Sequence, residues 1–148
     1  MADYILDKGF PVLSTYNSSA AGGVTRYRCV KTSVSGSTAF IDINATATTA
    51  NLGVVQEDID AIKVATGKTV ANVRLLGVTW VFASDTPGSI VVGSKVAASG
   101  TSTGIGGVKL AVATNIPLGV VIGMSVPGGT VAAGDLLSVL LTPGMPVI

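Results

Sequence analysis

The stretch 117–141, PLGVVIGMSVPGGTVAAGDLLSVLL, contains a single charged residue, Asp135. A helix could cross a bilayer with a stretch of this length, because about 20 apolar residues are enough. However, Pro117 and the run Pro127-Gly128-Gly129 would interrupt the hydrogen bonds of such a helix, and neither aromatic nor basic residues mark its ends. We therefore exclude a membrane span and expect no membrane partner.

The same stretch has the pattern of two β-strands around a turn. From Leu118 to Met124 the larger apolar residues alternate with small ones, and this period of two is that of a strand. The Pro-Gly-Gly run then turns the chain, and 136–141 is apolar on both faces. A buried helix is the alternative, and it fits this spacing less well.

Alternation with a period of two recurs along the rest of the chain. In 75–82 the large residues Val78, Trp80 and Phe82 share one face, as in a half-buried strand. Clusters of Gly, Pro, Ser and Asn separate such segments and predict turns. Short strands at this spacing predict a mainly all-β fold, a compact β-barrel or β-sandwich of about eight strands. The other alternating segments are 24–31, 38–43, 90–96 and 108–112.

One short helix is expected at 57–65, EDIDAIKVA. Its N-terminus would be capped by Asp58, because aspartate accepts hydrogen bonds from the first free N–H groups of a helix. Ile59 and Ile62 would then lie on one side of the helix.

The two ends of the chain differ from its middle. In residues 1–23 isolated large side chains are mixed with small polar residues, so this segment is unable to pack on itself. We expect an extended N-terminal arm that becomes ordered on a neighbouring molecule, and a frayed terminus is the alternative. The β-rich domain then spans 24–142. Residues 143–148 form a short apolar tail that its prolines keep out of any sheet interior.

The tetrapeptide LGVV occurs twice, at 52–55 and at 118–121. Each copy opens an apolar strand. Either the two strands have equivalent roles, or a chain rich in Gly and Val repeats the tetrapeptide by chance. The sequence leaves both explanations open.

The chain carries few charges for its size. Charged residues make up 11% and hydrophobic residues 48%, whereas about 25% charged residues is typical of soluble domains. We therefore expect part of the surface to be buried against further copies of the chain or against a partner. The formal net charge of +1 gives no attraction for nucleic acid, so none is expected as a partner. The acidic start of the chain does not resemble a secretory signal, so we expect the protein to be made in the cytoplasm and not to be exported by that route.

Residues for catalysis are scarce. The chain has no histidine, which is the commonest general base and metal ligand. Its single cysteine, Cys29, lies in an alternating segment and is expected to be a buried structural thiol. Gly67-Lys68-Thr69 resembles the end of a phosphate-binding loop, but Ile62 stands where that loop needs glycine, and a strand follows instead of a helix. We expect no enzymatic activity, no cofactor and no metal.

Four segments between residues 51 and 144 carry a resemblance to a known family: NLGVVQEDIDA, ATGKTVANVRLLGVTWVFA, IVVGSKVAAS, and PLGVVIGMSV followed by AGDLLSVLLTPG. They resemble the capsid decoration (cement) proteins of tailed bacteriophages. The resemblance implies a β-rich body, a homotrimer that binds the major capsid protein on the outer surface of the virion, and no catalysis. Such a protein would stabilise the phage capsid.

The large residues of the arm are the candidates for contact with the capsid: Tyr4, Ile5, Leu6 and Phe10. Two alternative functions remain. One is another structural component of the virion, such as a head fibre or a tail protein, which has a similar Gly/Val/Thr-rich composition. The other, from a different class, is a phage enzyme acting on nucleotides or DNA, which would need the turn at 67–69 to bind phosphate.

Overall fold

The computed structural model describes residues 10–14, 23–35, 38–62, 69–100, 104–126 and 129–142. Within these ranges the chain is mainly β-structure, which confirms the predicted all-β class. No helix in the described ranges is long and apolar enough to cross a membrane. The strands are β1 (Phe10–Ser14), β2 (Cys29–Ser35), β3 (Thr38–Ile43), β4 (Gly53–Val55), β5 (Thr69–Arg74), β6 (Gly77–Phe82), β7 (Lys95–Ser99), β8 (Gly107–Leu110), β9 (Pro117–Met124) and β10 (Leu136–Leu141).

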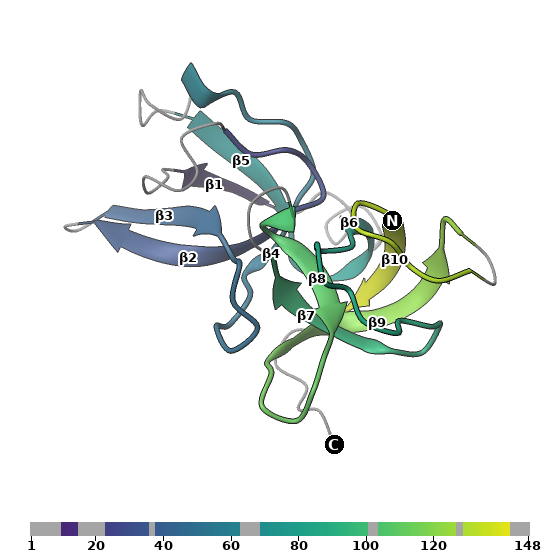
Figure 1. The fold of residues 1–148 in the computed structure, drawn as a ribbon. Coiled ribbons are helices and arrows are strands. Elements are labelled where there is room, and N and C mark those ends of the chain that lie inside the picture. The colour runs from purple at the N-terminus through teal and green to yellow at the C-terminus, as the bar shows by residue number, and fades with distance from the viewer. Residues whose placement is uncertain are drawn as a thin grey trace, which may run out of the picture.

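Strands β1 to β5 form the first unit of the fold (Figure 1). They pair in the order β1-β3-β2-β4-β5, and β1 also pairs with β5, so the sheet is a ring. All neighbouring strands are antiparallel except β1 and β3, which are parallel and meet through Ser14 and Ile41. The core of this unit consists of buried apolar residues: Val24, Val30, Ile41, Ile43, Val55, Ile59, Ala71 and Val73.

Strands β6 to β10 form the second unit, in the order β6-β10-β9-β7-β8. All of these pairs are antiparallel. A parallel bridge between Ala83, directly after β6, and Val108 of β8 brings the two end strands together. The hairpin predicted for 117–141 is confirmed, because β9 and β10 are antiparallel neighbours.

The two units share one topology. Written from the same end, their strand orders are β3-β2-β4-β5-β1 and β8-β7-β9-β10-β6, and in each unit a parallel contact joins the first strand in the chain to the third. The registers also correspond at one constant interval along the chain. Cys29 with Val54 matches Lys95 with Val120, Val30 with Gly53 matches Val96 with Gly119, Val54 with Arg74 matches Val120 with Leu140, and Val55 with Val73 matches Val121 with Val139. The chain is therefore a structural tandem repeat.

The LGVV tetrapeptide marks equivalent positions in this repeat. Its glycines, Gly53 of β4 and Gly119 of β9, lie against the neighbouring strand. A Cβ atom at Gly53 would collide with the carbonyl oxygen of Arg74, and one at Gly119 would collide with that of Leu140. Glycine is required at both positions for the same close approach of two backbones. Of the two explanations for the repeated tetrapeptide, equivalent strands is the correct one.

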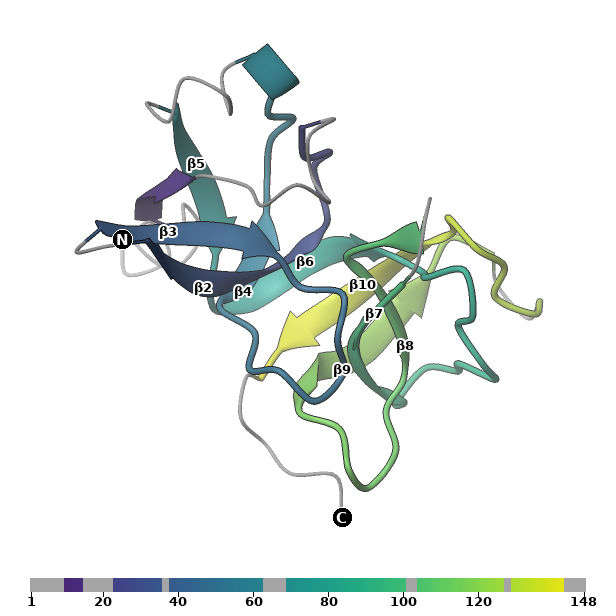
Figure 2. The same ribbon diagram turned by 60° about the vertical axis from the view of Figure 1, so that its left-hand side comes forward.

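The units pack through the outer face of the first sheet, as Figure 2 shows. Cys29 and Val54 point away from the core of the first unit and are fully buried among side chains of the second. Hydrogen bonds between backbones join the units at the same place. The N–H of Cys29 donates to the carbonyl of Gly106 at 2.7 Å, and the N–H of Phe82 donates to that of Tyr27 at 3.3 Å. The two cores thus meet across one sheet.

The predicted helix at 57–65 is much shorter in the described part of the chain. Only residues 61 and 62 are helical there, and 63–68 lie outside the described residues. The capping residue is Asp60, whose Oδ1 accepts a hydrogen bond from the N–H of Ile62 at 2.6 Å. Asp58, which we expected to cap, instead accepts the N–H of Arg26 at 2.8 Å. The capping prediction was therefore wrong by two residues.

Two further expectations differ from the structure. Ile59 and Ile62 do not share an environment, since Ile59 is buried in the first core and Ile62 is 75% exposed. The strand expected at 24–31 begins only at Cys29, because the chain turns at Arg26 and Tyr27, where Tyr27 has a φ of 65°. The described residues form ten strands, more than the expected number of about eight, because the chain folds into two five-stranded units and not one.

The repeat predicts matched effects of substituting its glycines. Gly53→Ala and Gly119→Ala should each lower the free energy of unfolding by about 1–3 kcal/mol, because the methyl group forces the strands apart. Gly123→Ala is the control. A Cβ atom there would be 3.4 Å from the Cβ of Ser138, which is an ordinary contact, so its stability should be unchanged or slightly higher. Urea denaturation measures all three. Equal stability of Gly53→Ala and wild type would contradict the close approach.

Candidate interaction surface

The predicted capsid contacts lie mostly beyond the described residues. Tyr4, Ile5 and Leu6 are outside them, so their role stays a prediction. Phe10 begins β1, where it pairs with Val73 of β5. This part of the expected arm therefore belongs to the first sheet.

The turn that resembles a phosphate-binding loop is also largely outside the described residues. Gly67 and Lys68 are not described, and Thr69 is the first residue of β5, paired with Ser14. The strand predicted to follow this turn is present.

Cys29 is a structural residue, as predicted. Its side chain is fully buried between the two units, and its thiol lies 3.9 Å from the carbonyl oxygen of Gly107. Burial raises the pKa of the thiol to about 12, although the neighbouring charge of Arg28 opposes this shift. Nucleophilic chemistry needs the thiolate, so Cys29 is unreactive in the folded protein.

Arg28 is one of the charged residues at the junction of the two units. Its guanidinium lies 4.7 Å from the centre of the Phe82 ring, and its Nε donates to the hydroxyl of Thr25 at 3.2 Å. The ring of Tyr27 is also near Phe82, and the two ring centres are 6.1 Å apart. Burial lowers the pKa of Arg28 from its ordinary value, yet an arginine stays protonated in proteins. The junction therefore carries a fixed positive charge.

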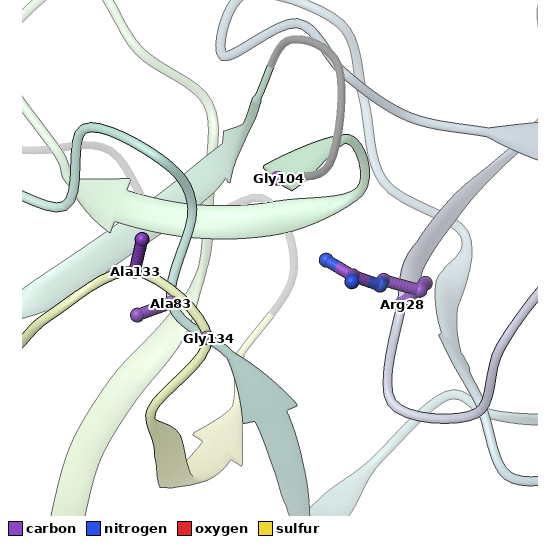
Figure 3. A pocket seen from close by; sticks show the side chains of 5 residues that line it. All are labelled: Arg28, Ala83, Gly104, Ala133 and Gly134. Atoms are coloured by element: carbon purple, nitrogen blue, oxygen red, sulfur yellow. The ribbon is translucent and has the colours of Figure 1, made fainter.

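A small cavity lies beside this charge (Figure 3). It has a volume of about 230 Å³ and is lined by Arg28, Ala83, Gly104, Ala133 and Gly134. Pockets for drug-sized ligands usually measure about 300–1,000 Å³. Arg28 is the one ionisable residue in the described lining, and general acid–base catalysis needs a group that can exchange a proton near neutral pH. The cavity thus offers neither the space nor the groups for an active site.

One group of exposed side chains on the described surface is apolar. It lies on the outer face of the second sheet, across β6, β10 and β9. Leu140 pairs with Val78 on one side and with Val120 on the other, so their side chains form one row. Trp80 follows in β6 and Ile122 in β9. We call this set of residues the open face: Val78 (44% exposed), Trp80 (43%), Ile122 (46%), Leu140 (39%) and the half-buried Val120.

The sequence predicted these strands but not which of their faces is exposed. Val78 and Trp80 share a face as expected, yet that face points outward, and the inward residues of β6 are Thr79 and Val81. Alternation alone does not distinguish the two faces when both carry apolar residues. Contiguous exposed apolar patches mark sites of interaction. The open face is therefore the candidate binding surface.

Titratable residues do not gather elsewhere on the described part of the chain. No group of three or more His, Cys, Asp or Glu residues there could hold a metal ion. Asp42 is buried in the first unit, which raises the pKa of its carboxyl group, and the N–H of Ile43 donates to it at 2.8 Å. It lies in β3 and serves the structure of that strand.

Cys29 should resist alkylation until the protein unfolds. At pH 8 iodoacetamide should modify it only at the rate of unfolding, and quickly in urea. Because its pKa is raised in the folded state, stability should fall as the pH rises from about 8.5, the ordinary value, towards 12. Mass spectrometry of alkylated samples measures the first effect. Rapid modification under native conditions would contradict the burial of the thiol.

The contact between Arg28 and Phe82 should stabilise the junction measurably. In a double-mutant cycle of Arg28→Met and Phe82→Leu, the coupling free energy should be about 0.5–2 kcal/mol, as for a partly desolvated cation–π pair. Urea denaturation of the four proteins gives this value. Additive effects of the two substitutions would mean that Arg28 and Phe82 do not stabilise each other and that another contact accounts for the burial of Arg28.

No known protein family matches the sequence, and no curated protein matches it either. The fold does have a counterpart among solved structures. The crystal structure of the head fibre gp8.5 N base of bacteriophage phi29 superposes on this chain with a TM-score of 0.56 at 18% sequence identity, covering 93% of this chain and 97% of that one. The chain thus shares its fold with the base of a phage head fibre over nearly the full length of both.

Proposed function

We propose that this protein is a structural component of a phage virion, bound to the outside of the head as the base of a head fibre. The observation that carries the proposal is the match to the phi29 head fibre base, which extends over both units of the repeat. A match confined to one unit would reflect only a common five-stranded arrangement. A shared arrangement of two units is a more specific likeness.

Capsid decoration is the second candidate function. It rests on the sequence resemblance of residues 51–144 and predicts the same location on the outer capsid surface. The head fibre is favoured over decoration because the structural neighbour is a fibre base. A tail protein has no comparable support.

The chemistry of the described residues fits a structural role. Cys29 is buried with a raised pKa, and the cavity beside Arg28 is small and lacks a second ionisable group. The second sheet has an exposed apolar face, which is suited to binding protein. We therefore propose a protein without enzymatic activity.

We further propose that the protein binds the major capsid protein as a homotrimer. Three linked copies would bind the shell by avidity, so that modest individual contacts give stable attachment. Tyr4, Ile5, Leu6 and Phe10 remain the candidates for the capsid contact, and the first three precede β1.

Electron cryo-microscopy of the phage tests the location. The expected result is density for this fold on the outside of the head, at the foot of a projecting fibre. Heads of the wild-type phage and heads of a phage from which the gene for this protein is deleted should differ only in that density. A uniform coat of the protein over the shell would support decoration instead. Density in the tail, or none in the virion, would overturn the proposal.

Substitutions before β1 test the capsid contact. The variant with Tyr4→Ser, Ile5→Ser and Leu6→Ser keeps β1, which a deletion of 1–23 would remove. Its affinity for empty phage heads should fall at least about tenfold, as expected when an apolar anchor is lost. Co-sedimentation with heads measures this affinity. Ile62→Ser, an exposed position in the first unit, is the control and should bind like wild type. Undiminished binding by the triple variant would remove the arm from the capsid contact.

A further inference from the structure

The two units of the repeat treat the same face of their sheets differently. In the first unit this face is sealed. Cys29 and Val54 point outward and have no exposed surface, because they pack on the second unit. Residues beside them reach β6. Nε2 of Gln56 donates to the hydroxyl of Thr79 at 3.0 Å, and the guanidinium of Arg74 donates to the carbonyl of Val78.

In the second unit the equivalent face is the open face. The row Cys29, Val54, Arg74 of the first unit corresponds to the row Lys95, Val120, Leu140 of the second. Nothing in the described part of the chain seals that second row, and Leu140 and Ile122 beside it are 39% and 46% exposed. The same face at the same register is therefore buried in the first unit and exposed in the second.

We propose that a second copy of this chain covers the open face, head to tail. Within the chain, the first face is sealed by β6, the first strand of the following unit, together with the start of β8. The counterpart of β6 in the repeat is β1, which belongs to the first unit. The occupant that continues this pattern is therefore the first unit of another copy, seated on the second unit of its neighbour.

A contact of this kind joins two different surfaces, so each copy offers one of each. Repeated contacts of this type close into a ring where the rotation allows it and extend as a filament where it does not. The closed ring agrees with the proposed trimer. The inference itself rests on the repeat and not on a role in a virion.

The composition of the open face suits a protein partner. Trp80 lies among aliphatic residues, and tryptophan is the residue type that most often anchors protein interfaces. The half-buried Lys95 lies at the end of the row, as charged residues do at the rim of an interface. Other exposed apolar residues, such as Ile62 and Val112, are in other parts of the chain. Single apolar residues at a surface need no partner to explain them.

Trp80 is the only tryptophan in the chain, so its fluorescence reports on the open face alone. The full-length protein is measured from about 1 μM to about 100 μM, the range in which weak protein contacts form. Sedimentation velocity gives the mass, and acrylamide quenching gives the exposure of Trp80. We expect quenching to fall, and the emission to shift to shorter wavelength, as the mass increases. A protein that stays monomeric throughout, or an oligomer with undiminished quenching, would overturn the proposal.

Two variants test the surface directly. Ile122→Asp and Leu140→Asp place a charge on the open face and should raise the dissociation constant of self-association at least tenfold. Val112→Asp is the matched control, because it adds the same charge at an exposed apolar position that lies outside both the open face and the first unit, and it should associate like wild type. Circular dichroism checks folding. If both variants unfold, the test rests on the acrylamide quenching of Trp80 in the wild-type protein. Unchanged association of a folded variant would refute the proposal.

The test of this contact can fail or succeed independently of the proposed function. An oligomer that buries Trp80 but ignores phage heads would support this contact and refute the role in the virion. A protein that stays monomeric but binds heads through the open face would refute this contact and support the role in the virion. The two variants would then lose head binding.

Discussion

The packing of the second unit, through β6 and the start of β8, on the outer face of the first sheet is the contact on which the rest of the structure depends. It buries Cys29 and Val54 completely and links the cores of the two units. The raised pKa of the thiol and the cavity beside Arg28 are consequences of this contact. So is the asymmetry between the units, because the first sheet is covered by the second, while no described element covers the same face of the second.

This asymmetry is the usual property of short repeats. A small sheet with apolar residues on both faces must cover one face with something outside itself, and in repeat proteins the neighbouring unit supplies that cover. Terminal repeats normally have a polar outer face for the same reason. The second unit here instead has an apolar outer face with Trp80 and Ile122. A low content of charged residues is expected on the same ground, if the proposed second copy covers this face.

The sequence predicts the local structure of this protein better than its arrangement. Alternation located β6, β9 and β10, because the period of a strand is visible in any segment with apolar residues. It did not reveal which face of β6 is buried, since Thr79 and Val81 are inward and Trp80 is outward. The repeat is almost invisible in sequence because equivalent positions need only similar size and geometry. It survives in LGVV, where the backbone of the adjacent strand leaves no room for a side chain. The cap at Asp60 was missed because three acidic residues lie close together and tertiary contacts select among them.

Comparison of the sealed and open faces also explains why they differ in composition. Gln56 and Arg74 of the sealed face correspond in the repeat to Ile122 and Leu140 of the open face. The sealed contact forms within one chain, so the linkage has already removed most of the entropy that association costs, and polar side chains are sufficient there. A contact between separate molecules must overcome about 4–15 kcal/mol of lost translational and rotational freedom. More apolar area is needed to do so, at about 25 cal/mol per Å². Isoleucine and leucine at these two positions supply this apolar area. Such differences between the units are those expected when one face binds within the chain and the other binds a separate copy.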